Sequence, residues 1–375
     1  MQLNSLFYKS YYHWWKNIDK TILFTIVILF NLGLFFSLAS TSLIASDALN
    51  TNSYYFFIKH LLFVIFGIFF LIFFSSLKSE DLVKISRLVF ILLLISLILV
   101  PFFGTEVKGS RRWIDISFLP RFQPIELLKP FLIVIFASIL NYENNKNIYY
   151  KIFLSFLILA PILILLIMQP DVGQTLLTLL SWLSLIFISG INLIIFFASF
   201  ILFCFLLLGA VYIFPDKFGY IIARLKTFFD PSSGNNYQSE KASEAIINGG
   251  FFGKGIGEGT LKNRVPEAHT DYIVSVISEE FGVLFIIILM IIFLFFVYQV
   301  FKRLYSQENN LSKLILVGSM SIILLQTLIH IGVNIRMFPT TGMTLPYISY
   351  GGSSIISISI LSGIILNFTK RKVDN

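Results

Sequence analysis

The sequence predicts an all-α, polytopic integral membrane protein with about ten transmembrane helices. Composition and pattern both support this fold class. Hydrophobic residues make up 57% of the chain and charged residues only 13%, whereas soluble domains carry about 25% charged residues. Apolar stretches long enough to cross a bilayer, about 20 residues, recur along the sequence. The sequence shows no internal repeat of 20–50 residues and no domain linker. Residues 1–375 are therefore predicted to form one membrane domain.

Ten apolar segments reach the necessary length when they are taken in chain order. The first is as long as a true span, which excludes a cleavable signal peptide at this position. The fourth and sixth are interrupted by polar residues and have the weakest hydropathy. The ten segments are 21–44, 56–77, 85–103, 122–141, 150–168, 171–189, 191–214, 271–301, 313–337 and 345–368.

Basic residues orient these spans, because cytoplasmic loops are enriched in Lys and Arg. The first outer loop, 45–55, has no basic residue, and an even number of spans returns the chain to its starting side. Both termini are therefore predicted to be cytoplasmic. The basic residues then on the inner side are Lys9, Lys16, Lys20, Lys78, Lys84, Arg87, Lys146, Lys151, Lys302, Arg303, Lys313, Lys370, Arg371 and Lys372.

The short outer loop 104–121 breaks this charge rule. It contains Lys108, Arg111, Arg112 and Arg121. Attraction to anionic lipid headgroups is one explanation. The other is a binding site for a phosphorylated ligand, because guanidinium groups bind phosphate oxygens as a planar fork. Trp113 would anchor this loop at the membrane interface.

The largest outer segment, 215–270, is predicted to contain a short helix over 237–248 and then a glycine-rich run over 249–259. Glycines allow a backbone to turn sharply or to approach a ligand closely. No strand precedes the run, so neither a Rossmann nor a Walker site is indicated. A flexible loop is the alternative.

A cluster of polar, titratable residues lies at the start of the eighth span. It contains Glu267, His269 and Asp271, and Glu279 and Glu280 follow inside the span. An ionised side chain at mid-bilayer depth costs roughly 2.5–3.5 kcal/mol, so these acids need a partner or a chemical role. The structural alternatives are a helix-dipole contact for Asp271 and an interfacial histidine at position 269.

Three further polar residues allow structural or functional interpretations. Glu126 and Lys129 are three residues apart and share one helix face, so we expect an ion pair that neutralises itself in lipid. Asp171 follows Pro170 at a helix start, where an N-terminal cap and a functional acid are equally supported.

Cys204 is the only cysteine, which excludes a disulfide framework and a thiolate metal site.

Six motifs, taken together and in order, resemble those of the SEDS family (shape, elongation, division and sporulation proteins). The resemblance spans about residues 20–370. The motifs are Gly-Ser-Arg-Arg-Trp-Ile at 109–114, Phe-Gln-Pro-Ile-Glu-Leu-Leu-Lys at 122–129, Gln-Pro-Asp-Val-Gly at 169–173, the outer segment from Arg224 through Tyr237 and Gln238 to the glycine-rich run, Pro-Glu-Ala-His-Thr-Asp-Tyr at 266–272 with Glu279 and Glu280, and Leu-Pro-Tyr-Ile-Ser-Tyr-Gly-Gly-Ser-Ser at 345–354.

The departures from the family pattern are few. Ile125 stands where Ser is usual, and Arg336 stands where Gly is frequent. The stretch 339–346, with Thr344 where the elongation branch more often has Pro, is more similar to the division branch of the family.

The resemblance implies a peptidoglycan glycosyltransferase that polymerises lipid II at the outer face of the bacterial inner membrane, at the division septum for a division-branch member. It is expected to invert the configuration of the donor sugar. Asp271 is the expected catalytic base. The expected substrate-binding residues are Lys108, Arg111, Arg112, Trp113, Asp171, Tyr237, Gln238, Glu267 and His269. No metal site or cofactor is expected, although a divalent cation is left open.

The resemblance also implies partners. These are lipid II, the growing glycan strand, a class B penicillin-binding protein, other membrane proteins of the division machinery and membrane lipids, but no nucleic acid. The chain has no Ser-x-x-Lys acylation motif in an outer loop, so crosslinking requires another protein. The small residues of 345–368 are expected to contribute a docking surface, with internal packing as the alternative.

Three other functions fit the same residues: a lipid II flippase, an elongation-type polymerase and a scaffold without activity. A polymerisation assay with purified protein separates the enzyme from the flippase and the scaffold.

Overall fold

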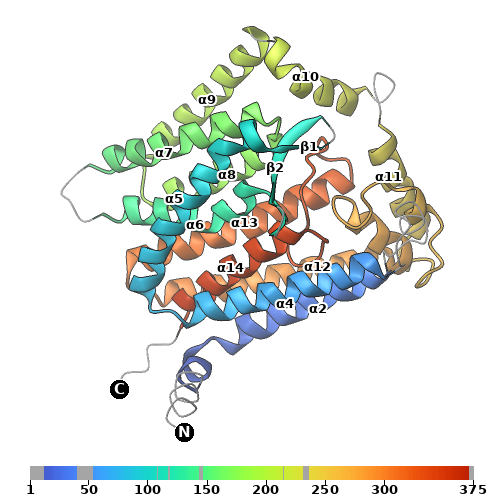
Figure 1. Ribbon diagram of the computed structural model, residues 1–375, viewed down its shortest axis with the longest axis horizontal. Helices are drawn as coiled ribbons and strands as arrows, with labels where there is room; N and C mark the ends of the chain where they lie inside the picture. The colour runs from blue at the N-terminus through green and yellow to red at the C-terminus, as the bar shows by residue number, and fades with distance from the viewer. Residues whose placement is uncertain are drawn as a thin grey trace.

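The computed structural model describes residues 12–39, 54–107, 109–116, 119–142, 147–213, 215–230 and 236–370. Within these ranges, each predicted span corresponds to one helix. The long helices lie side by side, with the start of α2 and the end of α14 at one end of the bundle (Figure 1). They are α2 (Lys20–Ala39), α4 (Tyr55–Ser76), α5 (Ser79–Phe103), α6 (Pro124–Leu140), α7 (Ile148–Met168), α8 (Val172–Ile188), α9 (Leu193–Ile213), α12 (Ile273–Tyr305), α13 (Asn310–Asn334) and α14 (Gly352–Phe368).

Six of these helices, within the part of the chain that the structure describes, are long and apolar enough to cross a membrane. They are α2, α4, α5, α7, α12 and α13, and the apolar helices α8 and α14 are shorter. The predicted fold class, a multi-pass helical membrane protein, is confirmed. The predicted count of about ten transmembrane helices is approximate.

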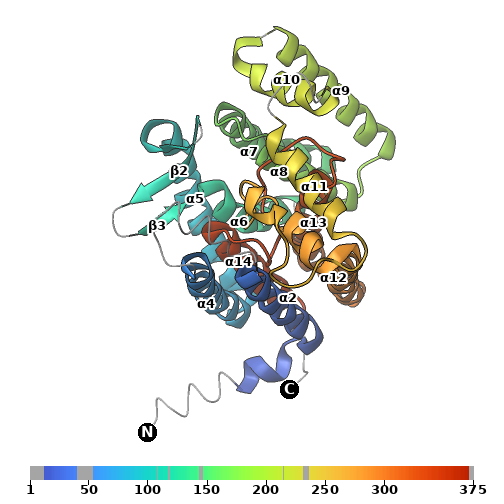
Figure 2. The ribbon, with the colours of Figure 1, turned by 90° about the vertical axis from the view of Figure 1, so that its right-hand side faces the viewer.

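Helix α14 lies inside the bundle, surrounded by α4, α6 and α13 (Figure 2). Its residues 353–355 and 357–368 are buried. A side chain at Gly67 of α4 would overlap Ser359, and one at Gly363 would come within 2.8 Å of the carbonyl oxygen of Leu71. The small residues thus let α4 and α14 approach closely. The expectation that they form a docking surface was wrong, and the internal-packing alternative is correct.

The last predicted span begins seven residues too early. Residues 345–351 form a loop, and α14 begins only at Gly352. Pro346 lacks a backbone N–H group and disfavours a helix at this point. The loop is fixed to the segment before α12, because the backbone N–H of Tyr350 donates to the carbonyl of His269 (2.9 Å) and the Ser349 hydroxyl donates to that of Thr270 (2.7 Å).

The loop 104–121, which is predicted to lie on the outer side, contains an antiparallel sheet that the sequence did not lead us to expect. Its strands are β1 (Thr105–Val107), β2 (Ser110–Ile116) and β3 (Leu119–Phe122), in the order β1-β2-β3. Gly109 has a φ of 76° in the turn between the first two strands, a conformation that favours glycine. The sheet projects from the bundle beside α5 (Figure 2).

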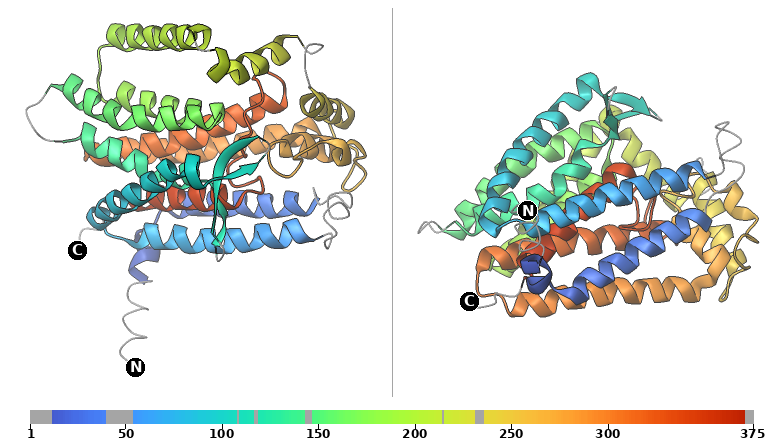
Figure 3. Two further views of the ribbon diagram at one scale, coloured as in Figure 1. Left: turned by 45° about the horizontal axis from the view of Figure 1, so that its top comes forward. Right: turned by 60° about the horizontal axis from the view of Figure 1, so that its bottom comes forward.

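The large outer segment contains two helices. Helix α11 (Tyr237–Gly249) confirms the predicted helix over 237–248. Helix α10 (Pro215–Phe229) was not predicted. It follows α9 at the edge of the bundle (Figure 3), and the Tyr220 hydroxyl fixes it to the end of α7 by donating to the carbonyl of Ile167 (3.2 Å).

The glycine-rich run packs backbone to backbone against a break in α12. Gly282 interrupts this helix with a φ of 80°. The run supplies hydrogen bonds there: the N–H of Lys254 donates to the Glu279 carbonyl (2.9 Å), and the N–H of Val283 donates to the Gly250 carbonyl (3.0 Å). A side chain at Gly253 would overlap the Glu280 carbonyl. Close approach to α12 therefore explains Gly253, and also Gly249, where a Cβ would overlap the Ser278 carbonyl.

Glu279 completes this junction. Its Oε1 atom accepts hydrogen bonds from the backbone N–H of Leu261 (2.8 Å) and from the Asn248 amide (3.1 Å). Its side chain is buried, and buried carboxylates are retained where such donors stabilise them. The acid at position 279 thus has a structural role, which the sequence left open.

Candidate active site

A cavity of about 470 Å³ lies at the end of the bundle that carries the sheet, between the sheet, the segment before α12, and the loop that follows α13. Its polar lining residues include Ser110, Arg112, Arg121, Gln123, Glu126, Arg224, Gln238, Glu267, Thr270, Asp271, Tyr272, Thr340, Thr341, Thr344, Tyr350, Ser353 and Ser354. These residues come from segments that are distant in the sequence.

The cavity brings together part of the predicted site. Arg112, Trp113, Gln238, Glu267 and Asp271 line it, and so does Glu126. Four other predicted substrate-binding residues are not part of the lining: Arg111, Asp171, Tyr237 and His269. Lys108 lies outside the described residues.

Hydrogen bonds with the Asn334 side chain hold the backbone at Asp271 and at the start of α12. The Asn334 amide donates to the Asp271 carbonyl (3.0 Å), and the Asn334 side-chain oxygen accepts from the N–H of Ser275 (3.2 Å). Asn334 itself is fully buried at the end of α13. On the other side, a Cβ at Gly342 would lie 3.6 Å from Asp271 Oδ2. The half-buried carboxyl group thus faces a glycine that leaves space beside it.

Glu267 and His269 both precede Asp271 but make different contacts. Glu267 has a φ of 56° and accepts a hydrogen bond from the Thr270 hydroxyl on its side chain (3.1 Å). A positive φ is uncommon at a residue with a side chain. The His269 ring stacks on Phe56 of α4 with centroids 4.5 Å apart. This contact matches the interfacial-histidine alternative rather than a position in the cavity.

Arg112 ties the sheet to the turn between α7 and α8. Its guanidinium donates to the carbonyls of Gln169 (3.0 Å) and Pro170, and its Nε atom lies 3.8 Å from Asp171 Oδ2. Its side chain is only 17% exposed. Arg112 is therefore held in a fixed position at the edge of the cavity.

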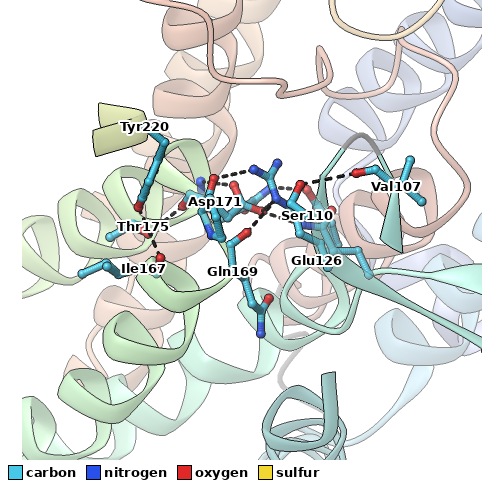
Figure 4. Close-up of polar contacts among 12 residues, drawn as sticks. Val107, Ser110, Glu126, Ile167, Gln169, Asp171, Thr175 and Tyr220 are labelled. Atoms are coloured by element: carbon cyan, nitrogen blue, oxygen red, sulfur yellow. Dashed lines mark hydrogen bonds and ion pairs between the residues drawn. The ribbon is translucent and has the colours of Figure 1, made fainter. Parts of the chain in front are cut away.

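Asp171 acts as the N-terminal cap of α8, one of the two roles that the sequence allowed. Its side chain accepts from the N–H of Gln174 (3.3 Å) and from the Gln123 amide (2.8 Å). Figure 4 shows it among the polar contacts that join Gln169, Thr175 and Glu126 in this region. Its contact with the cavity is indirect, through the lining residues Arg112 and Gln123.

Arg111 lies on the other side of the strand, because successive side chains of a strand alternate. It pairs with Glu106 on β1 at 3.6 Å, and its side chain is 53% exposed. Two adjacent arginines thus have different surroundings. Of Arg111 and Arg112, only Arg112 borders the cavity.

The predicted pair of Glu126 and Lys129 is present on α6. Lys129 also donates to the Gln326 side chain on α13 (3.3 Å), and Gln174 of α8 donates to Glu126. Gln326 in turn donates to the carbonyl of Thr344 (3.0 Å). This chain of polar contacts links three helices to the cavity wall.

Two cavity arginines were not among the predicted site residues. Arg121 ends the sheet and pairs with Asp115 at 3.2 Å. Arg224 of α10 donates to the carbonyl of Thr340 (3.1 Å). Burial, followed by the nearby Arg112, lowers the pKa of Arg224 from its ordinary value. Two guanidinium groups that repel each other in this way would be stabilised by a bound anion.

Gln238 lines the cavity from the first turn of α11, whereas Tyr237 is 48% exposed and lies near Lys241.

Among the described residues, no group of three or more His, Cys, Asp or Glu side chains could hold a metal ion. The cavity combines the Asp271 carboxylate with the guanidinium groups of Arg112, Arg121 and Arg224, a combination suited to proton transfer beside an anionic group.

Comparison with known proteins gives consistent results. A family model described as cell cycle protein, for FtsW, RodA and SpoVE, matches residues 20–373. The chain is 30% identical over 363 residues to a "Probable peptidoglycan glycosyltransferase FtsW" of Caulobacter vibrioides, covering 96% of this chain and 91% of the relative. It is 33% identical to a protein of the same name from Coxiella burnetii, covering 93% and 95%.

Two solved structures share the fold. A peptidoglycan synthase complex that coordinates polymerisation and crosslinking contains a chain with a TM-score of 0.78 and 23% identity, covering 94% of this chain and 97% of that one. The rod shape determining protein RodA of Thermus thermophilus gives a TM-score of 0.68 and 22% identity, covering 94% and 96%.

Proposed function

The chain belongs to the FtsW, RodA and SpoVE family of cell cycle proteins, and we propose that it is a peptidoglycan glycosyltransferase that polymerises lipid II for septal wall synthesis. The observation that carries this proposal is the outer cavity, in which Asp271 lies with Arg112 and Arg224. A polymerase of this kind needs a base for a sugar hydroxyl and cations for a pyrophosphate. This one cavity contains both a carboxylate that can act as the base and the cationic guanidinium groups.

The proposed reaction is a single in-line displacement. The 4-hydroxyl oxygen of the acceptor GlcNAc attacks the anomeric carbon of the donor sugar. As the new glycosidic bond forms, the bond from that carbon to the lipid pyrophosphate breaks and the pyrophosphate leaves with the electron pair. The hydroxyl proton passes to the Asp271 carboxylate. The configuration is inverted, and no covalent enzyme intermediate is needed.

Asp271 is better placed for the base than the other two cavity acids. Glu126 is neutralised by Lys129, which lies 2.9 Å away, and a neighbouring cation weakens the basicity of a carboxylate. Glu267 accepts a hydrogen bond from Thr270. Asp271 faces the side-chain-free Gly342, where an acceptor hydroxyl has room to approach.

Arg112 and Arg224 are the proposed pyrophosphate ligands. Charge on the pyrophosphate oxygens increases as the bond to the sugar breaks, so guanidinium groups fixed before the reaction stabilise the transition state. Arg112 is fixed by the backbone carbonyls of Gln169 and Pro170. This assignment replaces Arg111 with Arg224 in the pair expected from the sequence.

The proposed setting is the bacterial cytoplasmic membrane at the division septum, with both termini in the cytoplasm and the cavity on the outer side. The proposed partner is a class B penicillin-binding protein that crosslinks the new strand, together with other membrane proteins of the division machinery. Its docking surface would lie on exposed helix faces, such as that of α12 with Leu284, Ile287 and Ile291.

The test is glycan synthesis by purified protein supplied with lipid II, with and without the cognate transpeptidase. Polymer that depends on an intact Asp271 supports the proposal. If well-folded protein carries lipid II across liposome membranes but forms no polymer under either condition, the chain is a transporter and the proposal fails.

A further inference from the structure

A second cavity, of about 940 Å³, lies at the opposite end of the bundle from the candidate active site. Three chain segments meet there: the start of α5, the connection between α12 and α13, and the end of α14. This end carries the end of α14 (Figure 1) and is predicted to be cytoplasmic. Its charged lining residues are Glu80, Lys84, Arg87, Arg303, Glu308 and Lys370.

Lys370 is the most informative residue of this cavity. Its half-buried ammonium group donates to the carbonyl of Leu77 (3.0 Å), and it forms no ion pair within the described part of the chain. Burial lowers the pKa of Lys370 to about 8. An ammonium group that is partly removed from water and faces only a carbonyl would gain from an anion in the cavity.

The wall around Lys370 is rigid. Asn367, which is buried, donates to the carbonyl of Leu77 (2.7 Å) and accepts from the Ser79 hydroxyl (3.1 Å). These contacts fasten the turn between α4 and α5 to the end of α14. The cavity is therefore a formed feature of the fold and does not depend on the position of a loose surface lysine.

The remaining cations add to the positive potential. Arg87 of α5 is exposed and forms no ion pair with any residue that the structure describes, whereas Arg303 is paired with Asp19. The two acids of the lining, Glu80 and Glu308, are exposed, and salt screens exposed charges most strongly. The N-termini of α5 and α13 also lie at this cavity and contribute partial positive charge.

We propose that this cavity binds a phosphate-bearing anion on the cytoplasmic face, with Lys370 and Arg87 as its cationic ligands. The phosphate belongs either to the headgroup of an anionic phospholipid of the inner leaflet or to a soluble phosphate compound. A basic pocket between helices at this membrane surface is the arrangement that anionic headgroups occupy in membrane proteins. The proposal does not depend on the function assigned to the outer cavity.

The experiment uses the full-length protein, purified and delipidated in a neutral detergent. Thermal unfolding is followed while phosphatidylglycerol is titrated in mixed micelles, with phosphatidylcholine as the uncharged reference and inorganic pyrophosphate as the soluble arm. The variants are Lys370→Gln and Arg87→Gln. Lys302→Gln is the matched control, because Lys302 is an exposed cation near the same end of α12 but does not line the cavity.

Saturable stabilisation by phosphatidylglycerol or by pyrophosphate is expected, and the effective ligand identifies the source of the phosphate. Each cavity variant should weaken the apparent affinity roughly tenfold, the loss expected for one charge-assisted hydrogen bond. The exposed Arg87 variant keeps the test valid if Lys370→Gln folds poorly. Stabilisation by neither ligand, or an equal loss in Lys302→Gln, would overturn the proposal.

Discussion

Lys129 Nζ lies 2.9 Å from Glu126 Oε2 within one turn of α6, and both side chains are almost completely buried. The protein thus contains an ion pair shielded from water, at the base of the cavity that Glu126 lines. In such surroundings the partners depend on each other, because each charge alone is expensive to bury. The pair therefore predicts a pattern of stability that an exposed pair would not give.

Glu126→Gln or Lys129→Met alone is expected to destabilise the protein by about 3–5 kcal/mol, because one buried charge remains uncompensated. The double variant should recover much of this loss. The measurement is the unfolding temperature in detergent. The matched control is the pair Lys241 and Glu244 of α11, which has the same i,i+3 spacing at 2.6 Å but side chains that are 23% and 48% exposed. Losing this solvent-accessible pair should cost about 0.2–1 kcal/mol.

If the single changes at positions 126 and 129 abolish polymerisation but leave the unfolding temperature unchanged, the pair acts on the substrate and the structural interpretation is incorrect.

Arg112 and Arg111 allow a second comparison within one strand. Arg112→Lys is expected to reduce turnover of lipid II by roughly tenfold or more, because a lysine loses a charge-assisted hydrogen bond of about 1.5–3 kcal/mol and cannot form the same fork. Arg111→Lys should remain close to the parent, since Arg111 pairs with Glu106 outside the cavity. If neither substitution changes turnover, the loop acts only through its total charge, which both substitutions conserve.

Local patterns predicted those parts of the molecule that local physics determines. The spans follow from the length of the apolar runs. The pairing of Glu126 with Lys129 follows from their spacing on a helix, and Asp171 as a helix cap follows from its position after Pro170. Each of these features depends on residues within a few positions of one another.

Features that depend on distant segments were missed. Arg112 is held by Gln169, 57 residues away, and Arg224 meets the carbonyl of Thr340, 116 residues away. The sheet of residues 105–122 has strands of three to seven residues. Such strands are too short to show a clear alternation of apolar and polar residues. The composition of α14 indicated close packing but not which neighbour it would pack against.

The glycine-rich run gives a test of backbone packing. Gly253 and Gly257 have similar φ values, 80° and 84°, but a Cβ would overlap the Glu280 carbonyl only at Gly253 and would meet nothing within 4 Å at Gly257. Both alanine variants should incur the left-handed cost of about 1–2 kcal/mol. Gly253→Ala should unfold at a clearly lower temperature, because it also displaces the loop from α12. Equal unfolding temperatures would contradict the packing that we describe.

The strongest prediction concerns Asp271. Asp271→Asn keeps the shape of the side chain but removes its ability to accept a proton, so polymerisation should fall by roughly 10²–10⁴-fold, the contribution of a positioned base. Lipid II binding and the unfolding temperature should stay near those of the parent, because Asn334 holds this segment through the backbone carbonyl of residue 271. Glu258→Gln is the matched control: it removes an exposed carboxylate from the same outer segment without touching the cavity. Polymerisation by Asp271→Asn at the level of Glu258→Gln would remove Asp271 from the role of base and return the assignment to Glu267 or Glu126.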